Sequence, residues 1–271
     1  MDQGPVPKPN WAFRVRLFIL LAVLLMVGGY AAHDVYVRRA RTDWQRTLLV
    51  AVVVLEVEPV DQQALSDFGA RLPVLQEKLA LEAQRYRPEL AEPFEFQLFG
   101  PIEVREPPPE PSGTSFFELS AHAYRQWRYL RRIDEHAGVA TRAYDGRLYV
   151  TVRRPKDKGK TLVEGFSEDG GRIGTVSVDL DDDMVDLALF VVAHELLHTL
   201  GATDKYDARG HVVVPYGLAD PELQPLYPQT HVEIMARNRP LALGKEVTPD
   251  SLEELRVGTK TAREIGWLAA E

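Results

Sequence analysis

The stretch from His194 to Asp204 reads His-Glu-Leu-Leu-His-Thr-Leu-Gly-Ala-Thr-Asp and is the strongest indication of the chain's fold. Histidines four residues apart on a helix lie one turn above each other on the same face. The imidazoles of His194 and His198 can therefore meet at one metal ion without distortion of the backbone. Glu195 lies about 100° round the helix from His194, which suits it to touch a water on the metal rather than to bind the metal itself.

A glycine after the second histidine lets the chain reverse. Gly201 tolerates the left-handed backbone that ends many helices, and the turn would bring Asp204 back as a third, anionic ligand. Three protein ligands plus one water form the open coordination of a catalytic zinc, whereas a structural zinc is closed by four ligands. We therefore predict a Zn²⁺ site at His194, His198 and Asp204.

Two other interpretations of the stretch stay open. His211 or His231 could replace Asp204 as the third ligand. The segment could also be a core helix whose histidines are only hydrogen-bonded, but polar groups on so apolar a helix need a reason to be buried, which favours the metal. The apolar residues that this helix offers for burial are Leu187, Phe190, Val191, Leu197 and Leu200.

An acidic run precedes the helix. Asp181, Asp182 and Asp183 predict a cap and favourable charge at the helix N-terminus. The run 179–183 could instead bind calcium, but helix capping is the simpler explanation.

The motif resembles the extended zinc motif of the metzincin metalloproteases, in the variant that has aspartate in place of a third histidine. Snapalysin-type secreted bacterial proteases share that aspartate and place a tyrosine two residues later, as Tyr206 is placed here. Met235, 37 residues beyond His198, lies in a segment similar to the methionine-containing turn beneath the metal. The resemblance covers roughly residues 172–268. The chain departs from snapalysins in having no cysteine, and no tyrosine closely follows Met235.

The resemblance implies an α+β, zincin-like fold with a mixed twisted sheet, an active-site helix, a Met-turn at Met235 and a C-terminal helix that begins near Thr248. It also implies peptide hydrolysis, with Glu195 as general base and Tyr206 assisting the oxyanion. Metzincins line the cleft with an edge strand just before the zinc helix, and residues 172–179 occupy that place in order. An extended peptide would then pair with Gly174, Thr175 and Val176.

Upstream of the motif the chain alternates strand and helix patterns. Strands are expected at 48–55, 94–104, 147–153, 161–166 and 172–180, the last two joined by a hairpin turn. Helices are expected at 61–87, with a kink at Pro73, and at 115–136.

Residues 17–32 carry no charge and follow Lys8, Arg14 and Arg16. This pattern predicts a single-pass membrane anchor over 17–37, after a short tail at 1–16 and before a basic connector at 38–46. The alternative is a signal peptide cleaved after Gly29-Tyr30-Ala31, which would release a secreted protein.

The remaining residues, 47–271, form one catalytic domain. They carry 25 basic and 37 acidic side chains, a net charge of −12, which argues against nucleic acid as a partner. The net negative charge, together with the tendency of metzincins to act on exported substrates, predicts that this domain lies outside the cytoplasm. The absence of cysteine excludes disulfides and thiolate ligands but does not identify the compartment.

These features predict a membrane-tethered zinc metalloendopeptidase that acts on protein or peptide substrates. A non-catalytic zincin-fold binding or scaffold domain is the alternative, although a scaffold has no use for Glu195. An intramembrane protease is excluded, because the helix is too short and is flanked by aspartates.

Overall fold

The computed structural model describes residues 11–109, 115–155, 163–167 and 170–269, which belong to two compact units, Met1–Ala40 and Arg41–Glu271. Most of the first unit is helix α1 (Trp11–Thr42). Among the described residues, α1 is the one helix long and apolar enough to cross a membrane, with a mean hydropathy of 2.2 over an 18-residue window. A signal sequence meets the same criterion, so both predictions for the N-terminus stand. The helix also continues through part of the predicted connector.

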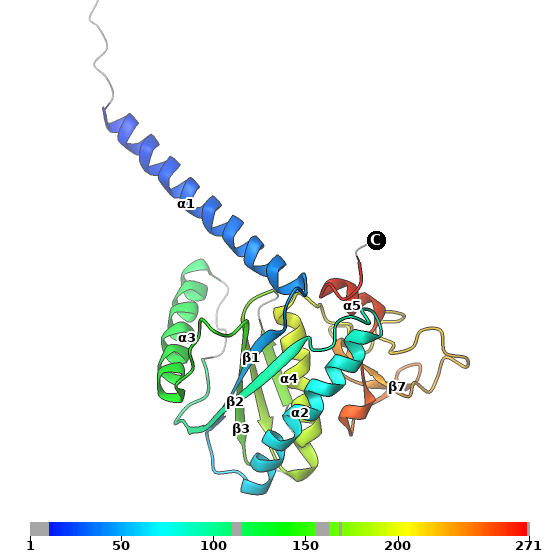
Figure 1. The fold of residues 1–271 in the computed structure, drawn as a ribbon. Coiled ribbons are helices and arrows are strands. Elements are labelled where there is room, and N and C mark those ends of the chain that lie inside the picture. Colours follow the sequence, from blue (N-terminus) through cyan, green and yellow to red (C-terminus); the bar gives the residue numbers. More distant parts are fainter. Residues whose placement is uncertain (1–10, 110–114, 156–162, 168–169, 270–271) are drawn as a thin grey trace, which may run out of the picture. The chain divides into compact units, whose positions relative to one another are not determined.

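The second unit is built on a sheet of five strands in the described part of the chain, in the order β2-β1-β3-β5-β4 (Figure 1). Four strands are parallel and β4 is antiparallel to its neighbour β5. The strands are β1 (Leu48–Glu56), β2 (Phe94–Glu103), β3 (Gly146–Arg153), β4 (Val163–Ser167) and β5 (Ile173–Asp179). The predicted mixed sheet with a hairpin before the motif helix is therefore confirmed. Because most of its strands are parallel, the architecture is mixed α/β, where an α+β fold was expected.

The residue pattern of strand β1 shows that both faces of the sheet are covered. Side chains alternate along a strand, and every position from 50 to 55 is apolar and buried. Val50, Val52 and Val54 join the core beneath α2 (Gln62–Gln84) and α4 (Val185–Thr199). The residues between them join a second core beneath α3 (Phe116–Ala137), on the other face of the sheet.

Helix α2 packs its apolar stripe against α4 and so fixes the position of the motif helix. Phe68, Leu75 and Leu79 on this stripe are fully buried. Asp61 caps the helix by accepting a hydrogen bond from the backbone of Gln63. The helix runs without interruption through Pro73, so the expected kink does not end it.

The C-terminal part is made of short elements that surround one end of α4. The described elements are β6 (Val232–Glu233), η2 (Ile234–Ala236), β7 (Arg239–Ala242), β8 (Lys245–Val247), η3 (Leu252–Glu254), β9 (Leu255–Arg256) and α5 (Thr259–Glu264). Strands β6 and β9 pair in parallel, and β7 pairs with β8.

Two expectations about helix ends were wrong. No helix begins at Thr248, because residues after Ser251 form only the η3 turn and then pair as β9, which leaves α5 short and late. The aspartates before α4 form no capping hydrogen bond, because residues 182–184 make a 3₁₀ turn (η1) instead. Asp186 in the first turn of α4 pairs with Arg71 and accepts from the backbone of Leu252.

Candidate metal centre

Helix α4 brings two histidines to one point. His194 and His198 are one turn apart, and their Nε2 atoms lie 3.1 Å from each other. Asp204 Oδ1 lies 3.1 Å from Nε2 of His198 and 3.3 Å from Nε2 of His194. Ligand atoms bound at about 2.0–2.1 Å to a tetrahedral ion stand about 3.3 Å apart. The three atoms therefore have the mutual spacing of three ligands on one zinc-sized ion.

The other nitrogen of each imidazole is tied to the backbone. Nδ1 of His194 donates to the carbonyl of Ile234 over 2.9 Å, and Nδ1 of His198 donates to the carbonyl of Ala202 over 2.8 Å. A carbonyl can only accept, so both Nδ1 atoms carry the proton and both Nε2 atoms present a lone pair. This is the arrangement in which outer hydrogen bonds fix metal-binding histidines.

Three acceptor atoms that face one another require positive charge between them. Burial lowers the pKa of His198, but Asp204 and Glu195 outweigh burial, and the net pKa is above the ordinary value. Burial raises the pKa of Asp204, yet the two imidazoles hold it well below its usual range. The donor set therefore fits Zn²⁺, with His194, His198 and Asp204 as the residues that would hold it.

The turn after α4 returns the aspartate as the glycine predicts. Gly201 has a φ of +99°, a left-handed conformation that most side chains avoid. Its backbone N–H donates to the carbonyl of His198, and that of Ala202 donates to Leu197. Beyond Asp204, the backbone of Lys205 donates to the carbonyl of Met235 over 2.8 Å, which joins the returning segment to the η2 turn.

The η2 turn contains Met235, which is fully buried beneath the two histidines' helix. Its position is fixed by Glu233, whose carboxylate accepts from the Met235 and Gly258 backbones and from the Thr261 hydroxyl. Complete burial raises the pKa of Glu233 to about 7, although these donors and Lys205 act to lower it. Glu233 thus stabilises the η2 turn, in which the Ile234 carbonyl accepts the hydrogen bond that orients His194.

Glu195 is buried beside the cluster and is held by the sheet. Ser167 on β4 donates to its carboxylate over 2.6 Å. Burial raises the pKa of Glu195 above the usual glutamate range, against the lowering effects of His194 and Ser167. Ligand atoms of His194, Glu195 and His198 all lie within 4.8 Å of one another. A carboxylate with a raised pKa at this distance can accept a proton from a water and give it up again.

Two glycines leave the space that Glu195 occupies. A Cβ on Gly165 of β4 would lie 2.7 Å from Glu195 Cγ, and one on Gly174 of β5 would lie 3.3 Å from Glu195 Cβ. Sequence reasoning missed Gly165 and Ser167. The expected hairpin placed Gly165 on a strand and Ser167 in the turn after it, but nothing local indicated that this strand faces the helix.

The expectation that residues 172–179 form the cleft edge was wrong. Strand β5 pairs with β3 on one side and with β4 on the other, so Gly174, Thr175 and Val176 are internal in the sheet. In the described part of the chain, the strand at the edge of the sheet next to Glu195 is β4, which pairs with β5 on its inner side.

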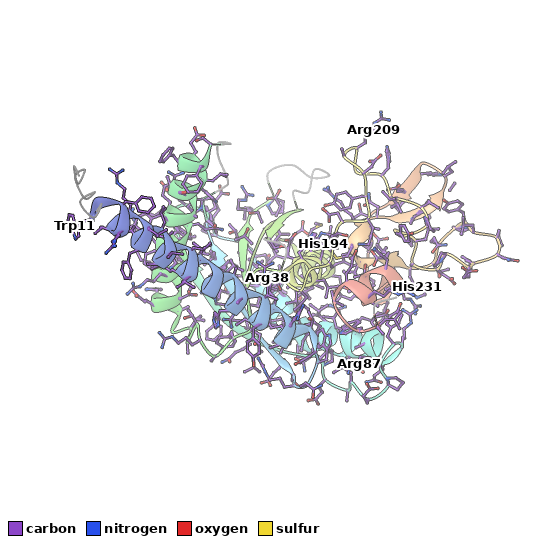
Figure 2. All side chains as sticks on the ribbon, turned by 90° about the horizontal axis from the view of Figure 1, so that it is seen from above. Trp11, Arg38, Arg87, His194, Arg209 and His231 are labelled. Carbon is purple, nitrogen blue, oxygen red and sulfur yellow. The ribbon has the colours of Figure 1, made fainter. Side chains whose placement is uncertain are left out.

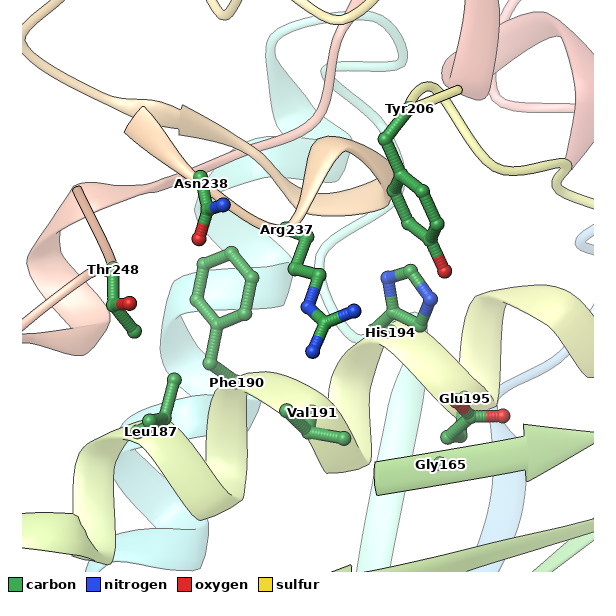
Figure 3. Close-up of a pocket in the computed structure, with 10 residues that line it drawn as sticks. All are labelled: Gly165, Leu187, Phe190, Val191, His194, Glu195, Tyr206, Arg237, Asn238 and Thr248. Carbon is green, nitrogen blue, oxygen red and sulfur yellow. The ribbon is translucent and has the colours of Figure 1, made fainter. Parts of the chain in front are cut away.

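A pocket of about 380 Å³ adjoins the cluster (Figure 3). Helix α4 forms one wall, with three apolar side chains in line with His194. Tyr206, Arg237, Asn238 and Thr248 close the other sides. Burial, with the nearby Asp204 carboxylate, raises the pKa of Tyr206 to about 12, so its hydroxyl stays protonated. The apolar wall consists of Leu187, Phe190 and Val191.

The other candidate ligands lie elsewhere. His211 has its Nδ1 atom 3.9 Å from Glu246. His231 contacts Arg256 at 3.1 Å and lies with the C-terminal segment rather than beside His194 (Figure 2). Asp204 is the third residue that the structure brings to the two histidines. Its role as a ligand remains a prediction.

No protein-family model matches the sequence, and no curated protein matches it. Among solved structures the chain is similar to archaemetzincin from Methanopyrus kandleri, with 20% identity and a TM-score of 0.33 over 62% of this chain and 79% of that one. The His-Glu-His group able to hold a metal is a feature of this chain's own helix α4.

Gly165→Ala tests the contact between β4 and Glu195. The added methyl group would displace the Glu195 carboxylate, and misplacement of a reacting group by about 1 Å costs about 100-fold in rate. For the peptidase activity proposed below, we expect the cleavage rate to fall by about that factor while the melting temperature changes little. Gly146→Ala on β3 is the matched control, because its Cβ would lie 3.6 Å from Leu196, an ordinary contact. Equal activity of the two variants would contradict the contact.

Glu233→Gln tests whether the buried Glu233 carboxylate stabilises the η2 turn. Because the pKa of Glu233 is raised in the folded state, the unfolded state releases this proton first, and the free energy of unfolding falls as the pH rises from about 4.5 to about 7. The fall amounts to about 3 kcal/mol at most. Urea unfolding at pH 5 and pH 8 should show a smaller pH dependence for Glu233→Gln than for the parent. The exposed control Glu92→Gln should behave as the parent, and an unchanged difference in Glu233→Gln would contradict the raised pKa.

Proposed function

We propose that this chain is a zinc metalloendopeptidase of the metzincin type, with Asp204 in place of a third histidine. The observation that carries the proposal is the convergence of three lone-pair atoms, within 3.3 Å of one another, beside a buried carboxylate. Both imidazoles have the tautomer that a metal needs, since their protonated Nδ1 atoms donate to the carbonyls of Ile234 and Ala202.

The chain's own residues supply the proton transfers. A zinc ion held at this site would polarise the scissile carbonyl and acidify a water. Glu195 accepts the proton of that water and later delivers it to the leaving amine, which its raised pKa favours. Ser167 holds the carboxylate in place meanwhile. Tyr206, protonated and stacked 6.4 Å from the His194 ring, is positioned to donate to the developing oxyanion.

The substrate is a protein or peptide in extended conformation. Strand β4 ends the sheet next to Glu195, and its outer edge offers backbone groups with which a peptide can pair as an added strand. This assignment moves the predicted substrate strand from residues 174–176 to β4. Nucleic acid is disfavoured as a partner by the net charge of −12 over residues 47–271.

The metal can be tested separately from the catalysis. We expect purified parent protein to bind about one zinc and to cleave casein. Asp204→Ala should lose at least about 100-fold in zinc affinity. Glu195→Gln should keep the zinc and lose about 10²- to 10⁴-fold in cleavage rate. The exposed control Glu92→Gln should retain both properties.

The same preparation separates the enzyme from the alternative. A zincin-fold scaffold that keeps its metal for stability would bind zinc fully and cleave nothing. Zinc measured by atomic absorption, with no cleavage of casein or gelatin by the parent, would therefore favour the scaffold.

Helix α1 is proposed to anchor the catalytic domain outside the cytoplasm, because its apolar run is longer than a signal peptide needs. We expect the full chain to stay with membranes after alkaline carbonate washing, and external protease to digest the domain on intact cells. A mature protein whose measured mass corresponds to a chain that starts after Ala31 would instead identify a secreted form. Protection of the domain from external protease would contradict the orientation.

A further inference from the structure

One residue of the pocket differs from its neighbours in charge. The wall that α4 contributes is apolar, and the remaining lining side chains outside the metal cluster are Tyr206, Asn238, Thr248 and Arg237. Figure 3 shows the Arg237 guanidinium reaching into the pocket between Phe190 and His194. A cation therefore stands where a substrate side chain next to the reacting bond would enter.

The backbone at Arg237 is strained in a way that aims this side chain. Arg237 has a φ of +73° and a ψ of −45°, and the backbone of Asn238 donates to the carbonyl of Ala236 over 2.8 Å. This is a γ-turn of the rare type with positive φ, which a non-glycine residue occupies at a cost. Glycine would adopt the turn freely, so an arginine here suggests a role for its side chain.

The guanidinium has no anionic partner within the described part of the chain. Neighbouring arginines are paired, as Arg239 is with Glu254 and Arg256 is with Glu82. Among the residues that the structure describes, Arg237 makes no ion pair and no side-chain hydrogen bond, although its charge acts on the Tyr206 hydroxyl. An unpaired guanidinium beside an apolar wall is a ready partner for a carboxylate, which it binds in bidentate fashion.

We propose that Arg237 selects substrates with an acidic residue, aspartate or glutamate, immediately beside the scissile bond. The proposal rests on the proposed peptidase function and names its substrate class. The apolar stripe of α4 packs against the aliphatic part of that residue, and Arg237 binds its carboxylate. Arg237 is a specificity residue in this assignment, and the reaction itself does not require it.

The test uses peptide pairs that differ only in charge. The full-length protein is given peptides with Asp or Asn, and with Glu or Gln, beside one cleavable bond, and mass spectrometry locates the cut and gives kcat/KM. The parent should cleave the acidic peptide at least tenfold faster than its amide partner. Peptides with a free or an amidated C-terminus distinguish a side-chain carboxylate from a terminal one, and equal rates are expected for the two.

Arg237→Gly is the main variant, because it removes the side chain and keeps the turn without strain. It should lose the preference for acid, with the fall in kcat/KM confined largely to the acidic peptides, so that the two members of each pair are cleaved at similar rates. Arg237→Lys should keep only part of the preference, since an ammonium cannot bind in bidentate fashion. Arg209→Ala, an exposed arginine in the loop after Tyr206 (Figure 2), is the control and should match the parent.

Three outcomes would overturn the proposal. They are no acidic preference in the parent, a preference that survives in Arg237→Gly, and a variant that slows all peptides equally, which would make Arg237 part of the reaction centre instead. Loss of preference only with amidated C-termini would assign the pocket to a terminal carboxylate and also contradict it. If the zinc-loaded parent cleaves no peptide at all, the proposed function fails rather than the specificity.

Discussion

Repulsion between acceptor atoms is the constraint on which the site depends. The Nε2 atoms of His194 and His198 and one oxygen of Asp204 lie at the corners of a triangle with sides of 3.1 to 3.3 Å. The imidazole protons are on the Nδ1 atoms, which donate to the carbonyls of Ile234 and Ala202. None of the three facing atoms can therefore donate a hydrogen bond to another. Only a cation or an added proton relieves this arrangement, and the fold maintains it through buried hydrogen bonds.

The elements beneath the site are needed to hold that geometry. The Ile234 carbonyl orients His194 only while the η2 turn stays in place, and Glu233 secures the turn by accepting three hydrogen bonds in a fully buried position. The Lys205 backbone joins the same turn to the segment that returns Asp204. A buried, satisfied network of this kind fixes one arrangement and would be costly to leave half-made. The metal site and the C-terminal elements are therefore one structural unit.

Sequence patterns predicted the features that depend on local periodicity. The spacing of four between His194 and His198, the glycine at 201 and the unbroken apolar run of β1 each translate directly into geometry. The order of strands does not, because it depends on contacts between distant segments, and this is why residues 174–176 were placed at an edge that β4 occupies. Capping by Asp181, Asp182 and Asp183 failed because residues 182–184 form a 3₁₀ turn, so that Met184 rather than an aspartate precedes α4.

The candidate metal site and the pocket proposed to select substrates share one stripe of α4. Leu187, Val191, His194 and His198 recur at three and four residues, so the same helix face that carries the histidines continues as the wall of the pocket. The η2 turn is equally shared, since it orients His194 at its start and presents Arg237 immediately after its end. A strained γ-turn costs about 1–3 kcal/mol, and it persists because Glu233 and the buried Met235 determine where the chain leaves the turn. The position of the guanidinium is thus set by the same contacts that orient the candidate ligand His194, so a change that displaces the η2 turn would affect both.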